Sequence, residues 1–88
     1  MAKREEKLNI KILSEDGSVF TGEGEALIVP SIAKKDPIAI LPYHTPLISL
    51  VGNGDVKVLL SEGFRTVATI DKGILYVGDN QATLLVNT

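Results

Sequence analysis

The chain has 88 residues, 44% of them hydrophobic, and a formal net charge of −2 with acidic and basic residues interspersed. These values are typical of one small domain with a single apolar core, and they argue against disorder. The lack of cysteine excludes disulfides and cysteine-based metal sites, while the few aromatic residues and the absence of a basic face argue against a nucleic-acid partner.

The N-terminal residues, MAKREEK, are charged and have no apolar segment behind them, so they do not resemble a signal peptide. We expect residues 1–7 to form a flexible tail ahead of one domain that spans residues 8–88. No apolar run approaches the roughly 18–20 residues of a membrane-spanning helix. The sequence therefore predicts a cytoplasmic protein, in agreement with its lack of cysteine, and any membrane connection would run through a partner.

The N-terminal half alternates short β-prone runs with turn signals. Leu8, Ile10 and Ile12 recur with period two, the pattern of a half-buried strand. Glu-Asp-Gly-Ser at residues 15–18 then predicts a turn. Residues 38–41 lie between two prolines and should form a short strand at a sheet edge. The strands predicted in this half cover residues 8–12, 19–21, 26–29, 38–41 and 47–51.

The C-terminal half is more regular. Its strands are predicted over residues 56–60, 64–70, 74–77 and 82–86. Connections as short as those at residues 61–63, 71–73 and 78–80 predict antiparallel hairpins, because parallel pairing needs a longer crossover. No stretch shows sustained helical periodicity, so the residues indicate a small all-β sandwich or barrel.

Residues 29–47 combine prolines with the chain's only histidine and differ most from a generic sheet sequence. Each proline fixes its own φ and pushes the preceding residue toward extended geometry. Pro42 and Pro46 bracket Tyr43, His44 and Thr45, and this stretch should be a stiff, irregular connection. A structured loop on a sheet scaffold is a favourable place for function.

His44 has three interpretations. It could act as a lone catalytic base, although no neighbour in the sequence is placed to orient it. It could bond the backbone of its own loop. It could also take part in a protein–protein contact beside Tyr43, and the last two interpretations are favoured over the first.

The sequence contains no constellation of residues for catalysis. It lacks the Ser nucleophile elbow and the phosphate-binding Gly-Lys motif, and one histidine is too few for a His-rich metal site. The tripeptide Asp71-Lys72-Gly73 is similar to the modified-lysine turn of lipoyl and biotinyl carrier domains. An ordinary Asp-x-Gly turn explains it better, and the carrier function is kept as an alternative.

Taken together, the residues resemble the N-terminal β-sandwich domain of the ATP synthase epsilon subunit. The resemblance rests on Phe20 and Gly22 after an acidic turn, on a Val-Pro step at residues 29–30, and on the run ILPYHTPL at residues 40–47. It extends through KGILYVGDNQATLLVNT at the C-terminus. Where the family favours glycine, this chain has Ser31, Ala39, Tyr43 and Lys72.

The resemblance implies a two-sheet antiparallel β-sandwich of about ten strands that catalyses nothing and needs no cofactor. It implies a place in the central stalk of a proton- or sodium-translocating F-type ATP synthase, where the domain would link the gamma subunit to the c-ring on the inner face of the cell membrane. The family continues into a two-helix hairpin, which we expect to be absent from a chain that stops at Thr88.

The same resemblance suggests two working surfaces. The side chains expected to face the gamma subunit are Pro42, Tyr43, His44 and Leu47. The loop expected to face the c-ring carries Lys34, Lys35 and Asp36. An unrelated small β-sheet interaction module stays open as a further alternative.

Overall fold

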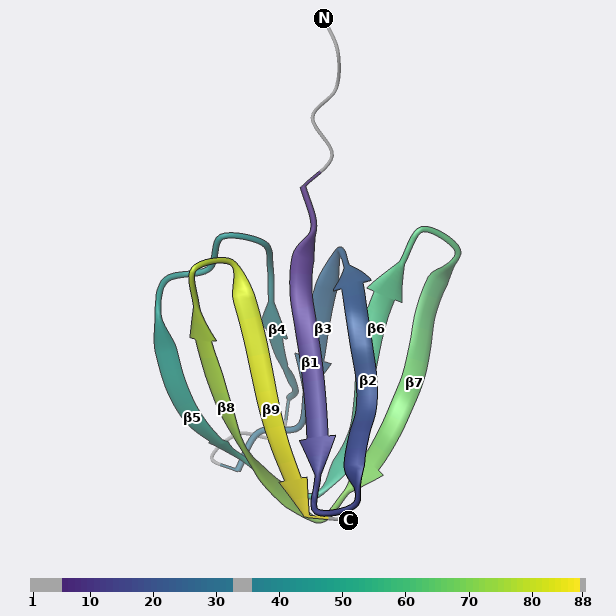
Figure 1. Cartoon of the computed structure of the whole chain (residues 1–88), viewed down its shortest axis with the longest axis vertical. Helices are drawn as coiled ribbons and strands as arrows, with labels where there is room; N and C mark the ends of the chain where they lie inside the picture. The colour runs from purple at the N-terminus through teal and green to yellow at the C-terminus, as the bar shows by residue number, and fades with distance from the viewer. Residues whose placement is uncertain (1–5, 33–35, 88) are drawn as a thin grey trace, which may run out of the picture.

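The computed structural model describes residues 6–32 and 36–87, and within these ranges the chain forms strands and no helix (Figure 1). In this part of the chain there is accordingly no helix with the length and apolar character to cross a membrane. The strands are β1 (Leu8–Ser14), β2 (Gly17–Gly24), β3 (Ala26–Val29), β4 (Ile38–Ile40), β5 (Leu47–Val51), β6 (Gly54–Leu60), β7 (Gly63–Ile70), β8 (Lys72–Gly78) and β9 (Gln81–Asn87).

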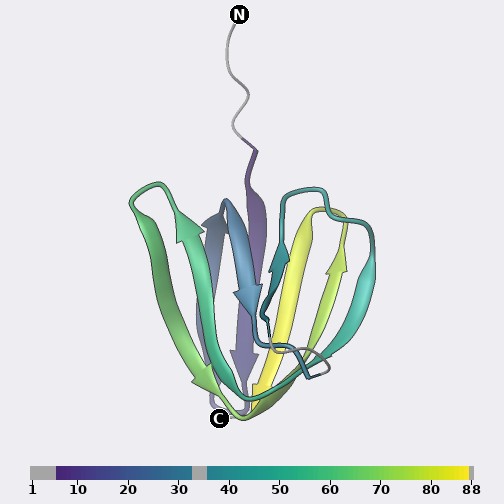
Figure 2. The same cartoon turned by 180° about the vertical axis from the view of Figure 1, so that it is seen from behind.

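The strands form two sheets that face each other, which confirms the predicted β-sandwich (Figures 1 and 2). One sheet has five strands in the order β2-β1-β9-β8-β5, and the other has four in the order β4-β3-β6-β7. All strand pairs are antiparallel except β1 and β9, which pair in parallel. The first strand therefore lies between its own hairpin partner and the last strand.

The core lies between the two sheets and is made of aliphatic side chains. The alternation predicted for Leu8, Ile10 and Ile12 is confirmed, because these three are buried while Asn9 and Lys11 between them are exposed. Leu27 from the four-stranded sheet and Leu84 from β9 are fully buried in the same cluster. No charged or polar side chain is buried among the described residues, so hydrophobic burial is the main stabilising term.

One predicted hairpin is wrong. The connection at Asp71 does not join two neighbouring strands, because β7 belongs to the four-stranded sheet and β8 to the five-stranded sheet. The chain instead turns from one sheet to the other, as happens at sandwich corners. The Asp71 amide donates to the Asn87 carbonyl oxygen at 3.0 Å, and Asn53 Nδ2 donates to Asp71 Oδ1 at 3.3 Å. A short connection excludes a parallel neighbour but does not require a hairpin.

Candidate functional site

The proline-bracketed loop at residues 41–46 joins β4 to β5 and begins with a tight turn. The His44 amide donates to the Leu41 carbonyl oxygen at 3.2 Å, which places Pro42 and Tyr43 at the centre of the turn. Tyr43 has a φ of 61°, in the left-handed region where L side chains are rare. A proline followed by a left-handed residue is the arrangement of a type II turn, which favours glycine at that second position.

The Tyr43 side chain points away from the core and is 66% exposed. Its backbone is held from outside its own loop, because its N–H donates to Asn80 Oδ1 at 2.8 Å. The other polar atom of the Asn80 side chain, Nδ2, donates to the Lys7 carbonyl oxygen at 2.7 Å. One side chain thus connects the loop to the residue that precedes β1.

Asn80 occupies the hairpin turn between β8 and β9. Asp79 and Asn80 have φ values of 51° and 56°, and a two-residue loop with both φ values positive is a type I′ turn. Asp and Asn tolerate this region better than other non-glycine residues. The Asn80 carbonyl oxygen also accepts from the Asn9 amide at 3.2 Å. The importance of Asn80 was missed from the sequence, where it reads only as a turn residue.

His44 bonds the backbone of its own loop. Its Nδ1 lies 2.7 Å from the Thr45 carbonyl oxygen, and because that oxygen can only accept, Nδ1 carries the hydrogen. This confirms the interpretation in which His44 bonds the backbone of its own loop. The described residues contain no group of three or more His, Cys, Asp or Glu side chains that could hold a metal ion.

Leu47 begins β5 with its side chain half-buried against the core, while the next residue, Ile48, is 72% exposed. The strand register puts Ile48 opposite Tyr76 and Tyr76 opposite Thr83 on the outer face of the five-stranded sheet. The same register aligns a second, apolar row on that face: Leu50, Ile74 and Leu85.

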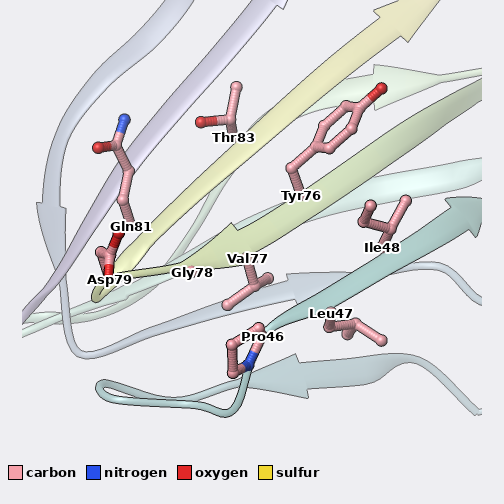
Figure 3. Close-up of a pocket in the computed structure, with 9 residues that line it drawn as sticks. All are labelled: Pro46, Leu47, Ile48, Tyr76, Val77, Gly78, Asp79, Gln81 and Thr83. Atoms are coloured by element: carbon pink, nitrogen blue, oxygen red, sulfur yellow. The ribbon is translucent and has the colours of Figure 1, made fainter.

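These two rows form an exposed, largely apolar surface that was not predicted from the sequence. A groove beside the proline-bracketed loop is lined by Pro46, Leu47, Ile48 and Tyr76, among others (Figure 3). The available signal was that runs such as LISLV and ILYV have apolar residues at successive positions, which in a strand face opposite sides. A strand with only one buried face would have alternated apolar residues with polar ones.

The residues expected to face the c-ring are only partly covered by the structure, because Lys34 and Lys35 lie outside the described residues. Asp36 is exposed and comes shortly before β4. The proline-bracketed loop follows the other end of β4, so the segments on either side of this strand leave it at opposite ends (Figure 2).

Lys72 does not have the geometry that a carrier domain needs. It is the first residue of β8 and pairs with Asn87, so it lies within the five-stranded sheet and not at the tip of a hairpin. The structural basis for the carrier alternative is therefore absent.

Comparison with known proteins identifies the family. Residues 7–88 match the family described as "ATP synthase, Delta/Epsilon chain, beta-sandwich domain". The ATP synthase epsilon chain of Bordetella parapertussis is 33% identical over 81 residues, which is 92% of this chain and 56% of that protein. The epsilon chain of Micrococcus luteus is 30% identical over 78 residues, covering 89% of this chain and 84% of that protein. The chain thus spans just over half the length of the Bordetella relative.

Solved structures show the same fold at low sequence identity. A chain of the Euglena gracilis mitochondrial ATP synthase, in an OSCP/F1/c-ring structure, aligns with a TM-score of 0.80 and 12% identity over 97% of this chain and 53% of that chain. A chain from the Tetrahymena thermophila mitochondrial ATP synthase central stalk and c-ring aligns with a TM-score of 0.69 and 10% identity, over 98% of this chain and 67% of that one. The sequence match covers nearly the whole chain, and the fold is the β-sandwich of the matched domain. The protein therefore belongs to the ATP synthase epsilon-subunit family through its β-sandwich domain, a non-catalytic part of the synthase.

Proposed function

We propose that this chain is a rotor component of an F-type, proton- or sodium-translocating ATP synthase, where it links the gamma subunit to the c-ring. The observation that carries the proposal is the family match over residues 7–88. The solved relatives come from structures described as central stalk and c-ring or as F1 and c-ring assemblies. The chain would act in the cytoplasm, on the inner face of the cell membrane, held there through the complex.

We place the gamma-facing surface on the proline-bracketed loop and the start of β5. Pro42, Tyr43, His44 and Leu47 belong to this segment, and the exposed Tyr43 ring is a suitable aromatic anchor because such residues dominate binding energy at interfaces. The turn at Leu41, the His44 bond to Thr45 and the Asn80 bond to Tyr43 all fix the backbone beforehand. Preorganisation lowers the entropy lost when a partner binds.

We place the c-ring contact on the loop that carries Lys34, Lys35 and Asp36. Support comes from the position of Asp36 before β4 and of the gamma-facing loop after it, so that two partners could bind without competing for one surface. Exposed charges at such a contact contribute more to registry and to the rate of association than to affinity.

The sandwich itself suits a part that transmits torque. Two sheets enclose one close-packed aliphatic core, and close packing gives protein interiors low compressibility. A single helix or an unstructured loop between the same partners would bend more easily under load.

The test is a pull-down of the 88-residue chain with the gamma subunit and with the c-ring of its own organism. The wild-type chain is expected to bind both, and a Tyr43→Ala/His44→Ala double variant should lose gamma while keeping the c-ring. A Lys34→Glu/Lys35→Glu variant should show the reverse pattern. Failure of the folded wild-type chain to bind either partner would refute the proposal.

Phe64→Ala is the matched control for Tyr43, because Phe64 is 64% exposed and lies on β7, at an edge of the other sheet. It should leave gamma binding unchanged. Circular dichroism on each variant separates loss of the interface from loss of the fold. If the double variant unfolds while its remaining folded fraction binds gamma normally, the loop has only a structural role.

A further inference from the structure

We infer that Asn80 is the positioning residue that holds Tyr43 in its left-handed conformation and thereby sets the shape of the proline-bracketed loop. The inference deepens the proposed gamma-facing role and, for its binding part, rests on it. Asn80 lies outside the loop, on the turn between β8 and β9.

Tyr43 needs support from outside its own residue to keep its positive φ. A left-handed conformation is unfavourable for an L residue other than glycine, and only surrounding structure can hold the residue there. The proline before Tyr43 fixes the first half of the turn, and the Leu41–His44 bond closes it. The Tyr43 amide itself points out of the turn, and its partner is Asn80 Oδ1 at 2.8 Å.

The side-chain amide of Asn80 has a defined orientation. Nδ2 donates to the Lys7 carbonyl oxygen at 2.7 Å, so the opposite atom, Oδ1, faces Tyr43. The backbone beneath is fixed as well, because the Asn80 carbonyl oxygen accepts from both the amide and the Nδ2 of Asn9, at 3.2 and 3.3 Å. Asn is the side chain that offers both a donor and an acceptor from one short, planar group.

Asn80 can be replaced without disturbing the turn that it occupies. Asn80→Gly removes the side chain and keeps the positive φ at no steric cost. Asn80→Asp keeps an acceptor oxygen for Tyr43 and removes the donor to Lys7. Comparing the two variants therefore distinguishes the effect of the bond to Tyr43 from the effect of the bond to Lys7.

The experiment measures hydrogen exchange of the Tyr43 amide by NMR on the 88-residue chain alone. Loss of one hydrogen bond should accelerate exchange at Tyr43 about fivefold to tenfold in Asn80→Gly, while Asn80→Asp stays within about twofold of wild type. The Leu84 amide, on β9, reports global unfolding, and the acceleration at Tyr43 is measured relative to it. Wild-type exchange at Tyr43 in Asn80→Gly, or equal acceleration in both variants, would overturn the inference.

A binding measurement then asks whether the positioning matters to the partner. Asn80→Gly should weaken gamma binding about fivefold to tenfold, and this loss should vanish when Tyr43 is already replaced by glycine. Equal losses in both backgrounds would show that Asn80 acts through the fold and not through Tyr43, and would overturn this part. If wild type does not bind gamma, the proposed function fails, whereas the exchange result still decides whether Asn80 positions Tyr43.

Discussion

The backbone N–H of Tyr43 donates a hydrogen bond to Asn80 Oδ1 at 2.8 Å, although the two residues are 37 positions apart in the chain. Each of them has a positive φ, and each lies in a tight turn at the end of a strand. The loop and the β8–β9 hairpin therefore support each other, and the most exposed aromatic side chain of the loop is attached to a fixed backbone. This relationship leads to a prediction about Tyr43 itself.

Tyr43→Gly should be more stable than Tyr43→Ala by about 1 kcal/mol. Alanine keeps the Cβ atom that opposes the left-handed conformation, which costs about 1–2 kcal/mol, whereas glycine removes that cost and loses roughly 0.5–1 kcal/mol through chain entropy. Urea unfolding of the two variants measures the difference. Equal midpoints would mean that the left-handed conformation at a φ of 61° costs no more than the chain entropy that glycine loses, against the prediction.

Leu84→Ala should destabilise the chain by about 2–5 kcal/mol, because Leu84 is fully buried between the sheets. A chain of this size has a total stability of roughly 4–13 kcal/mol, so the variant should be partly unfolded at moderate temperature. Leu85→Ala is the matched control on the same strand, since Leu85 is 41% exposed. Thermal unfolding checks both, and a comparable loss at Leu85 would contradict the register of β9.

Gly73→Ala should destabilise the fold by about 1–3 kcal/mol, because an added Cβ atom would lie 2.6 Å from the Leu85 carbonyl oxygen. That oxygen belongs to the paired backbone of β9, so moving it aside would disturb the pairing of β8 with β9. Gly78→Ala provides the control at the other end of β8, where a Cβ atom meets nothing within 4 Å. The comparison is made by urea unfolding, and an unchanged midpoint for Gly73→Ala would show that the two strands can separate locally.

Ile48→Lys should weaken gamma binding about tenfold or more while changing the stability by no more than about 0.5 kcal/mol. Ile48 is 72% exposed, so its loss costs little in the isolated chain, but a lysine would place a charge in the groove beside the loop. Thr21→Lys makes the same kind of change on β2, at the opposite edge of the sheet, and should leave binding unchanged. Isothermal titration with the gamma subunit is the measurement. Unaltered affinity in Ile48→Lys would confine the gamma-facing surface to the loop.

The strands and their inward faces could be predicted because the signal is local. The period-two spacing of Leu8, Ile10 and Ile12 predicts a strand with one buried face. Every predicted strand overlaps a strand of the structure. The LPYHTPL run was predictable as an irregular connection for a similar reason, since proline acts on its own residue and on the one before it.

The apolar surface beside the loop was harder to predict from the sequence. A strand with apolar residues on both faces is expected to be fully buried. In this two-layer sandwich, the outer face of the five-stranded sheet is left uncovered among the described residues, and Ile48 and Tyr76 are therefore exposed. The hairpin predicted at Asp71 was wrong for a related reason. A short loop excludes parallel pairing of the two strands that it joins, but it does not decide whether they belong to the same sheet.

The sequence by itself determined the all-β class, the strand positions, the irregular proline-bracketed loop and the family resemblance, because each depends on neighbouring residues or on a contiguous motif. Only the tertiary structure decided the parallel pairing of β1 with β9, the passage of the chain between sheets at Asp71, and the joining of Lys7, Tyr43 and Asn80 by one side-chain amide. These features depend on contacts between distant parts of the chain. Such contacts form only when the chain folds as a whole, and no local propensity encodes them.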